Sequence, residues 1–136
     1  MILQIATPKK LAVDMEVQSV TVPSADGDIT ILPKHENLLS LLHEGIITIR
    51  SEKEEQFMAI GGGYLETDGK TIHILVSRAY KQDEIDEAKT KMAIENARKI
   101  LHETKDRAER DEANSILRRS TVDLKLLGKL RRTKSS

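Results

Sequence analysis

Proline and glycine are concentrated in the first part of this 136-residue chain. All three prolines and six of the seven glycines lie within residues 1–80, and residues 81–136 contain only Gly128. Both residue types interrupt regular helices, whereas Ala, Glu, Lys, Leu and Arg, which dominate the second segment, favour them. The distribution therefore predicts a change of fold class near Tyr80, from short elements joined by turns to long helices.

Residues 1–80 contain short runs of β-branched and apolar residues that end at turn signals. Two clear runs are 2–7 and 12–17, and Asp26-Gly27 marks a tight turn between two further runs. Strands this short, separated by turns this frequent, are typical of an antiparallel sandwich or a small barrel. We therefore predict an N-terminal antiparallel β-sandwich over residues 1–80.

The stretch GGGYLETDGKT, residues 61–71, offers a candidate phosphate-binding loop. It ends in the G-K-T of a P-loop, but the first glycine of that motif would have to stand where Tyr64 stands. Residues 71–76 then read TIHILV, which predicts a strand rather than the helix whose N-terminus would bind the phosphate. We therefore interpret Asp68-Gly69 as a hairpin turn between two strands.

Residues 81–136 have the amphipathic pattern of two helices joined by a short connection, which predicts a C-terminal antiparallel hairpin. Asp83, with Asp86 three positions later, predicts the capped start of the first helix, and residues 102–106 interrupt the pattern. Because its many alanines would bury little area, we expect the hairpin to be marginal alone and able to change conformation. The predicted apolar faces are Ile85, Ala88, Met92, Ile100 and Leu101 in the first helix and Ala113, Ile116, Leu117, Leu124, Leu127 and Leu130 in the second.

Charge is balanced over the whole chain, with 22 basic and 22 acidic residues, but it is not balanced along it. Residues 115–136 contain seven Lys and Arg and a single acidic residue, Asp123. A solvated polar face is the simplest interpretation of this basic end, and an acidic partner is the more specific one. Nucleic acid is the less favoured partner, because the chain offers only three aromatic residues, two Tyr and one Phe, for stacking on bases.

No set of residues in the sequence assembles an active site. Cysteine is absent, the four histidines lack the H-E-x-x-H spacing of zinc proteases, and no serine lies in a G-x-S-x-G elbow. A metal site built from His35 and His43 stays open as an alternative. We therefore predict a protein that is not an enzyme and that has no resident cofactor.

Neither end of the chain predicts insertion into a membrane. The N-terminus lacks the basic start and long apolar run of a signal peptide. No segment approaches the roughly 20 apolar residues that a membrane helix requires. We therefore expect a chain that is soluble by itself.

Several motifs together resemble the epsilon subunit of F-type ATP synthases. In that family a V-x-V-P segment is followed by a turn glycine and the pattern [IV]-L-P-x-H-x-P-L-L, as here, except that Asn37 replaces the last proline. The likeness runs in order from residue 3 to about residue 130, and order and spacing together are more specific than any single motif. The segments that carry it are 7–8, 20–23, 26–28, 31–39, 45–50, 61–66 and 85–88.

The resemblance implies a non-catalytic subunit of the central stalk, which couples proton transport to ATP synthesis. The sandwich of such subunits binds the gamma subunit and the ring of membrane c subunits, and the family's contact with the ring falls on Asp28 and His35 here. The helical hairpin either folds against the sandwich or extends into the catalytic head of alpha and beta subunits, where it restrains ATP hydrolysis. Arg118, Arg119 and Lys125 are then expected to meet an acidic segment of the beta subunit.

Some bacterial members of that family sense ATP through a motif close to I-D-x-x-R-A at the start of the first helix. The matching residues here are Ile85, Asp86 and Lys89, so lysine replaces the arginine of the motif. Lysine keeps the charge but lacks the planar fork that holds phosphate at two points. The resemblance therefore implies ATP as a weak regulatory ligand at these three residues.

The resemblance also implies a peripheral position on the cytoplasmic face of a bacterial membrane, or alternatively on a plastid thylakoid membrane, reached only through the complex. Two other classes of function stay open. One is a free-standing sandwich adaptor whose basic hairpin binds an unrelated acidic protein, and the other is a small nucleic-acid binder that uses the basic end. Co-purification with ATP synthase subunits would separate the leading hypothesis from the adaptor.

Overall fold

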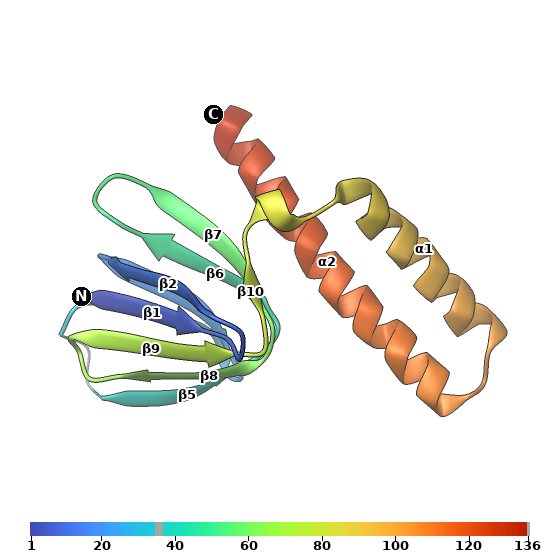
Figure 1. The fold of residues 1–136 in the computed structure, drawn as a ribbon, viewed down its shortest axis with the longest axis horizontal. Coiled ribbons are helices and arrows are strands. Elements are labelled where there is room, and N and C mark those ends of the chain that lie inside the picture. Colours follow the sequence, from blue (N-terminus) through green and yellow to red (C-terminus); the bar gives the residue numbers. More distant parts are fainter. Residues whose placement is uncertain (35–36, 136) are drawn as a thin grey trace. The chain divides into compact units, whose positions relative to one another are not determined.

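The computed structural model describes residues 1–34 and 37–135, with side chains up to residue 129. It divides into two compact units, Met1–Lys81 and Gln82–Ser136, and each is described by itself. Strands form the first unit and helices form the second (Figure 1). The predicted fold class, a β-sandwich followed by two helices, is therefore confirmed.

The first unit consists of short strands that follow the runs and turns expected from the sequence. The elements are β1 (Ile2–Ala6), β2 (Leu11–Glu16), β3 (Ser19–Ser24), β4 (Gly27–Ile31), β5 (Leu38–Leu42), β6 (Gly45–Arg50), β7 (Glu55–Ile60), β8 (Gly63–Thr67), β9 (Thr71–Val76) and β10 (Ala79–Tyr80).

The strands hydrogen-bond in the order β10-β7-β6-β3-β5-β8-β9-β1-β2, with β4 paired to β3. Because β3 and β5 share only the pair Ser24 and Leu42, the sheet turns a corner there and its two halves form the layers of a sandwich. Strands β5, β8, β9 and β1 lie side by side in one layer (Figure 1).

One strand pair differs from the antiparallel arrangement that the sequence predicts. Strands β1 and β9 run parallel, with Ile2 beside Thr71 and Ala6 beside Leu75. Antiparallel neighbours can be joined by a hairpin, whereas a parallel pair needs a long connection. Here the chain between β1 and β9 contains most of the sandwich. No local sequence signal in either strand predicts that the two run parallel.

Side chains alternate between the two faces of each strand, and the inward ones form the core. On β8 and β9, the paired Leu65 and Ile74 are fully buried, whereas the adjacent pair, Tyr64 and Leu75, is exposed. Inward-facing side chains of the other strands, which alternate in the same way, fill the space between the two layers. The other large side chains of this core that are less than 2% exposed are Leu3, Ile5, Val20, Val22, Ile31, Ile47, Ile49, Ile60 and Ile72.

The stretch that resembled a phosphate loop is a hairpin turn. The carboxylate Oδ1 of Asp68 accepts hydrogen bonds from the backbone N–H groups of Lys70 and Thr71, each at 2.9 Å, and Gly69 has a φ of 88°. These N–H groups are therefore already bound, and a strand rather than a helix follows them. The interpretation as a turn is confirmed.

The glycine triplet before this turn allows a close approach of two strands. A Cβ atom on Gly63 would lie 1.9 Å from the carbonyl oxygen of Leu75 on β9. Backbone atoms on both sides leave no side chain that could move away. Only glycine therefore fits at the start of β8 without shifting β9.

The second unit begins with the short 3₁₀ helix η1 (Gln82–Glu84) and continues with α1 (Glu87–Glu103) and α2 (Arg107–Ser135). The connection between the two helices, residues 104–106, lies within the interruption predicted at residues 102–106. The predicted cap is off by three residues, because Asp83 lies in η1 and Asp86 is the N-cap of α1. None of the helices in the described residues is long and apolar enough to cross a membrane.

The two helices of the hairpin face each other through small residues. Ala97 and Ala113 each lie eight positions from Lys105 in the connection, and Thr90 and Ser120 each lie fifteen positions from it, so each pair is level in an antiparallel hairpin. All four are buried. We call these residues the small-residue seam. Small side chains at these positions let the two helices approach closely.

The predicted apolar face of the first helix is wrong in part. Met92 is 61% exposed and Ile100 39% exposed, and Ala88 is also exposed. Thr90 and Ala97 are buried in their place. The covered side of α1 is therefore the one that carries Thr90 and Ala97, seven positions apart, and larger side chains next to it, those of Ile94 and Leu101, are half-buried.

Hydrogen bonds hold the connection between the helices. Arg110 donates from Nη1 to the carbonyl oxygens of Leu101, at 2.6 Å, and Thr104, at 3.2 Å. The Asp106 carboxylate accepts from the backbone N–H of Glu109 at 3.1 Å, which caps the start of α2. The end of one helix and the start of the next are therefore both satisfied locally.

Candidate partner-binding surfaces

A group of large apolar side chains lies on the outer surface of the sandwich. Leu39 and Leu41 on β5 are 71% and 70% exposed, and Tyr64 on β8 and Leu75 on β9 are 41% and 43% exposed. Leu41 pairs with Tyr64 and Tyr64 pairs with Leu75, so these three side chains form one row across three strands. We call the four residues the outer apolar patch. Contiguous exposed apolar surface of this kind marks an interaction site.

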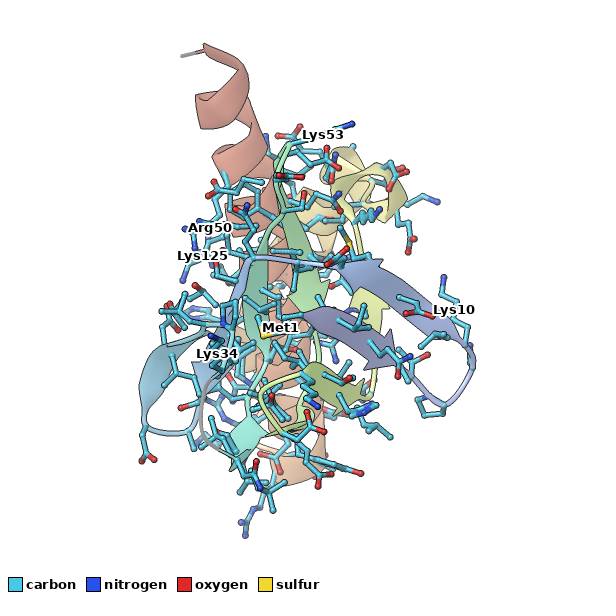
Figure 2. All side chains as sticks on the ribbon, turned by 90° about the vertical axis from the view of Figure 1, so that its left-hand side faces the viewer. Met1, Lys10, Lys34, Arg50, Lys53 and Lys125 are labelled. Atoms are coloured by element: carbon cyan, nitrogen blue, oxygen red, sulfur yellow. The ribbon has the colours of Figure 1, made fainter. Side chains whose placement is uncertain are left out.

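The charges beside the outer apolar patch are of one sign. Glu66 follows Tyr64 on the same face of β8, and Asp14 and Glu16 lie on β2 at the far edge of this layer. The strands β5, β8, β9, β1 and β2 contain these three carboxylates and no Lys or Arg. The lysines next to these strands lie in turns: Lys9 and Lys10 between β1 and β2, with Lys10 labelled in Figure 2, and Lys70 between β8 and β9.

A hollow of about 520 Å³ adjoins the patch at Leu39. The carboxylates of Glu66 and Asp68 lie in its wall together with the imidazole of His73. Hydrogen bonds from the backbone of Thr71 and of Lys70 hold the pKa of Asp68 below its ordinary value, so this carboxylate is negatively charged near neutral pH. The other residues that line this hollow are Asn37, Leu38 and Thr67.

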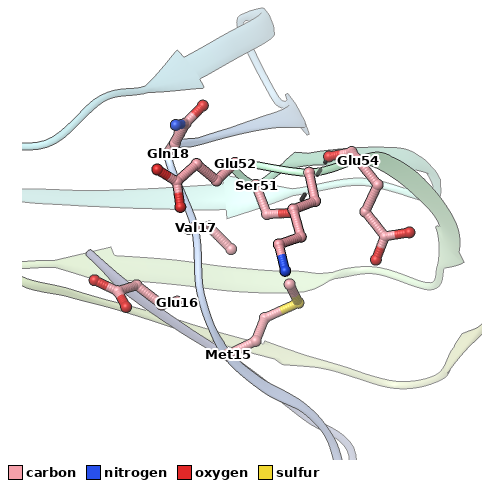
Figure 3. A pocket seen from close by; sticks show the side chains of 8 residues that line it. Met15, Glu16, Val17, Gln18, Ser51, Glu52 and Glu54 are labelled. Atoms are coloured by element: carbon pink, nitrogen blue, oxygen red, sulfur yellow. Dashed lines mark hydrogen bonds between the residues drawn. The ribbon is translucent and has the colours of Figure 1, made fainter.

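A second hollow, of about 480 Å³, lies where the β2–β3 and β6–β7 connections meet (Figure 3). Residues 15–18 and 51–54 line it, and the hydroxyl of Ser51 donates to the carbonyl oxygen of Glu54 at 3.3 Å. Three glutamates, Lys53, Gln18 and Ser51 form its polar wall. None of the site residues proposed from the sequence lies here.

Of the two residues expected at the c-ring, only Asp28 lies within the described part of the chain. Asp28 is exposed at the start of β4, and the L-P-x-H segment follows the other end of this strand, about 10 Å beyond Asp28 at 3.4 Å per residue. His35 lies outside the described residues. The alternative metal site, built from His35 and His43, is described only at His43. The ring nitrogen Nδ1 of His43 is 2.9 Å from the carbonyl oxygen of Glu44.

The proposed ATP site lies at the start of α1, where Asp86 has a structural task. Its carboxylate accepts a hydrogen bond from the backbone N–H of Lys89 at 3.0 Å, and its carbonyl oxygen accepts from the hydroxyl of Thr90 at 2.8 Å. The N-terminus of the helix is thus covered by a carboxylate, which does not suit phosphate. The side chain of Lys89 is exposed and is the single cation of the trio with Ile85.

The basic residues expected to meet the catalytic head lie on α2. Arg118, Arg119 and Lys125 are all exposed, and Lys125 is labelled in Figure 2. Arg118 and Lys125 are seven positions apart and therefore share one side of the helix, while Arg119 lies about 100° around it. The first two are on the side away from Ser120 in the small-residue seam.

Comparison with known proteins identifies the family. A model of the β-sandwich domain of the ATP synthase delta/epsilon chain matches residues 1–82. An ATP synthase epsilon chain of Moorella thermoacetica is 33% identical over 127 residues, which are 93% of this chain and 95% of that one. The chain belongs to the ATP synthase epsilon-chain family. An epsilon chain of Syntrophobacter fumaroxidans is 36% identical over 127 residues, covering 93% of this chain and 95% of its own.

Solved structures agree on the fold of this epsilon-family chain. A chain in the mitochondrial ATP synthase of Euglena gracilis superposes with a TM-score of 0.80 at 24% identity, covering 89% of this chain and 77% of that chain. Membership of this family makes the chain an accessory subunit of an ATP synthase and not itself catalytic, as the sequence predicted.

Sequence patterns did not predict the outer apolar patch. Residues 38–42, LLSLL, were not assigned to a strand, although Leu39 and Leu41 alternate with Leu38, Ser40 and Leu42. A run with leucine on both faces does not reveal which face is outward. The register with β8 settles this, because Leu41 stands beside the exposed Tyr64.

Proposed function

We propose that the chain is the epsilon subunit of the central stalk of an F-type ATP synthase, and that it binds the gamma subunit through the outer apolar patch. The observation that carries this proposal is the exposure of Leu39 and Leu41 on a well-packed sandwich. In a subunit of a larger assembly such surface belongs to an interface. In this role the chain couples proton transport through the membrane to ATP synthesis in the head.

The remaining contacts divide between the two units. The turn at Asp28 and the segment that contains His35 are proposed to approach the c-ring. When the hairpin opens, α2 is proposed to extend into the catalytic head of alpha and beta subunits and to restrain ATP hydrolysis. An acidic surface of the beta subunit would then contact Arg118, Arg119 and Lys125. The small-residue seam supports this role, because it buries little area and therefore separates at low cost.

These contacts would hold the chain at the membrane through the complex alone. The proposed position is the cytoplasmic face of a bacterial membrane, with the plastid thylakoid as the alternative. Support comes from the bacterial relatives and from a chloroplastic epsilon chain of Adiantum capillus-veneris that is 32% identical over 122 residues.

The direct test measures binding of the full chain to the gamma subunit by isothermal titration calorimetry. We expect Leu41→Asp to abolish binding, because it puts a charge in the middle of an apolar interface. The control is Met92→Asp, which changes another exposed apolar residue, on α1, and should bind as the wild type does. Equal affinity of Leu41→Asp and the wild type would overturn the assignment of this surface, and failure of the wild type to bind would favour the free-standing adaptor.

Regulation is tested separately with the catalytic head and gamma subunit. ATP hydrolysis is measured with the full chain and with a version that ends at Lys81, where the first unit ends. We expect both to bind and only the full chain to slow hydrolysis. Equal inhibition by the two would refute a role for the hairpin.

A further inference from the structure

We propose that the surface of the gamma subunit that covers the outer apolar patch carries a Lys or Arg side chain beside its apolar contact, and that this cation lies between Glu66 and Asp68. The inference rests on the proposed docking of the gamma subunit and adds the chemistry that this partner must present. It follows from the arrangement of charge on this layer.

Glu66 lies against the apolar patch. It pairs across the strands with Leu39 on one side and with His73 on the other, and directly opposite Cβ atoms on neighbouring strands are about 5 Å apart. A partner that covers Leu39 therefore also covers Glu66 or its immediate surroundings. A carboxylate that loses water on binding is costly unless a positive group meets it.

No Lys or Arg side chain of this layer is paired with Glu66, and the basic side chain opposite it, His73, makes no ion pair or hydrogen bond with it among the described residues. Among the described residues Glu66 has neither a salt bridge nor a hydrogen bond from its side chain. The strands around it contain no Lys or Arg, and the other carboxylates of the layer, Asp14 and Glu16, increase the negative charge. We therefore assign the counter-charge to the partner.

The hollow beside Leu39 gives this cation a place. Its volume of about 520 Å³ accommodates the head of a Lys or Arg side chain, and Glu66 and Asp68 both line it. Asp68 is charged near neutral pH but its Oδ1 already accepts two backbone hydrogen bonds, so its second oxygen is the one that faces a ligand. Leu38 and Leu39 offer apolar wall to the methylene stem of such a side chain.

Other occupants fit this surface less well. A metal ion would need several ligating groups close together, and the described residues contain no cluster of three His, Asp or Glu that could hold one. A second copy of the chain would bring its own Glu66, Asp14 and Glu16 against the same carboxylates. Like charges that meet across an interface cost several kcal/mol. A partner surface that is both apolar and basic therefore complements the apolar and acidic surface of this layer.

The test compares the binding of the gamma subunit to four full-length chains by calorimetry at low and at high salt. They are the wild type, Glu66→Gln, Glu66→Lys and the control Glu52→Gln, which removes an exposed carboxylate from the β6–β7 connection in the other layer. We expect Glu66→Gln to weaken binding about tenfold at low salt and to reduce its salt dependence, with a larger loss for Glu66→Lys. Glu52→Gln should match the wild type.

Two patterns would overturn the proposal. If Glu66→Gln and Glu66→Lys bind as the wild type does while Leu41→Asp loses binding, the patch is the interface but needs no cation. If the wild type does not bind the gamma subunit at all, the proposed function fails together with the inference. Since Glu66 is an exposed strand residue, thermal denaturation should show all four chains folded.

Discussion

Replacing Ala97 with leucine tests whether the small-residue seam sets the stability of the hairpin. Ala97 is 1% exposed and stands level with Ala113, also 1% exposed, so the larger side chain has no free space between the helices. Inserting methylenes into close packing typically costs about 1–3 kcal/mol. Because leucine forms helices nearly as well as alanine, this cost comes from the contact and not from α1 itself.

The assay is hydrogen exchange of the full chain, read separately in α1 and α2 and in the sandwich. A loss of about 1–3 kcal/mol in the opening free energy corresponds to a loss of roughly 5- to 150-fold in amide protection. We expect this loss in the hairpin and none at Leu65 or Ile74 in the core of the sandwich. The matched control is Ala88→Leu, at an exposed position of the same helix.

Unchanged or increased protection in the Ala97→Leu hairpin would refute the reasoning. It would mean that the helices separate enough to accept a large side chain, and that small residues are not what holds them close. A loss of protection in Ala88→Leu of the same size would also refute it, because the effect would then not depend on the seam.

Three further predictions concern single residues. Gly63→Ala should destabilise the sandwich by more than about 1 kcal/mol in chemical denaturation, because the new Cβ would lie 1.9 Å from the Leu75 carbonyl oxygen; an unchanged midpoint would contradict this. Asp68 has a pKa lowered from 3.8, so its contribution to stability is present above pH 3.8 and is lost as the pH falls through its folded pKa. Asp68→Asn should therefore show a smaller loss of stability than the wild type when the pH is lowered across that range, and parallel curves would refute it. If ATP binds at Ile85, Asp86 and Lys89, equilibrium dialysis at millimolar ATP will show binding that Lys89→Ala removes, whereas no binding to the wild type would end that prediction.

Local signals in the sequence determined much of this fold. The Asp68-Gly69 turn, the break at residues 102–106 and the change from strands to helices near Tyr80 all depend on which backbone conformations a few adjacent residues favour. Such preferences act without the rest of the molecule. The ordered motifs also identified the family before any strand was placed.

The surfaces, by contrast, depended on contacts between residues far apart in the chain. The exposure of Leu39 and Leu41 follows from the pairing of β5 with β8, and the parallel pairing of β1 with β9 follows from closure of the sandwich. In the hairpin, periodicity identified residues that share a side of α1, but α2 decided that Thr90 and Ala97 are buried rather than Met92. Sequence periodicity defines the faces of an element, and only its neighbours in the tertiary structure determine which face is covered.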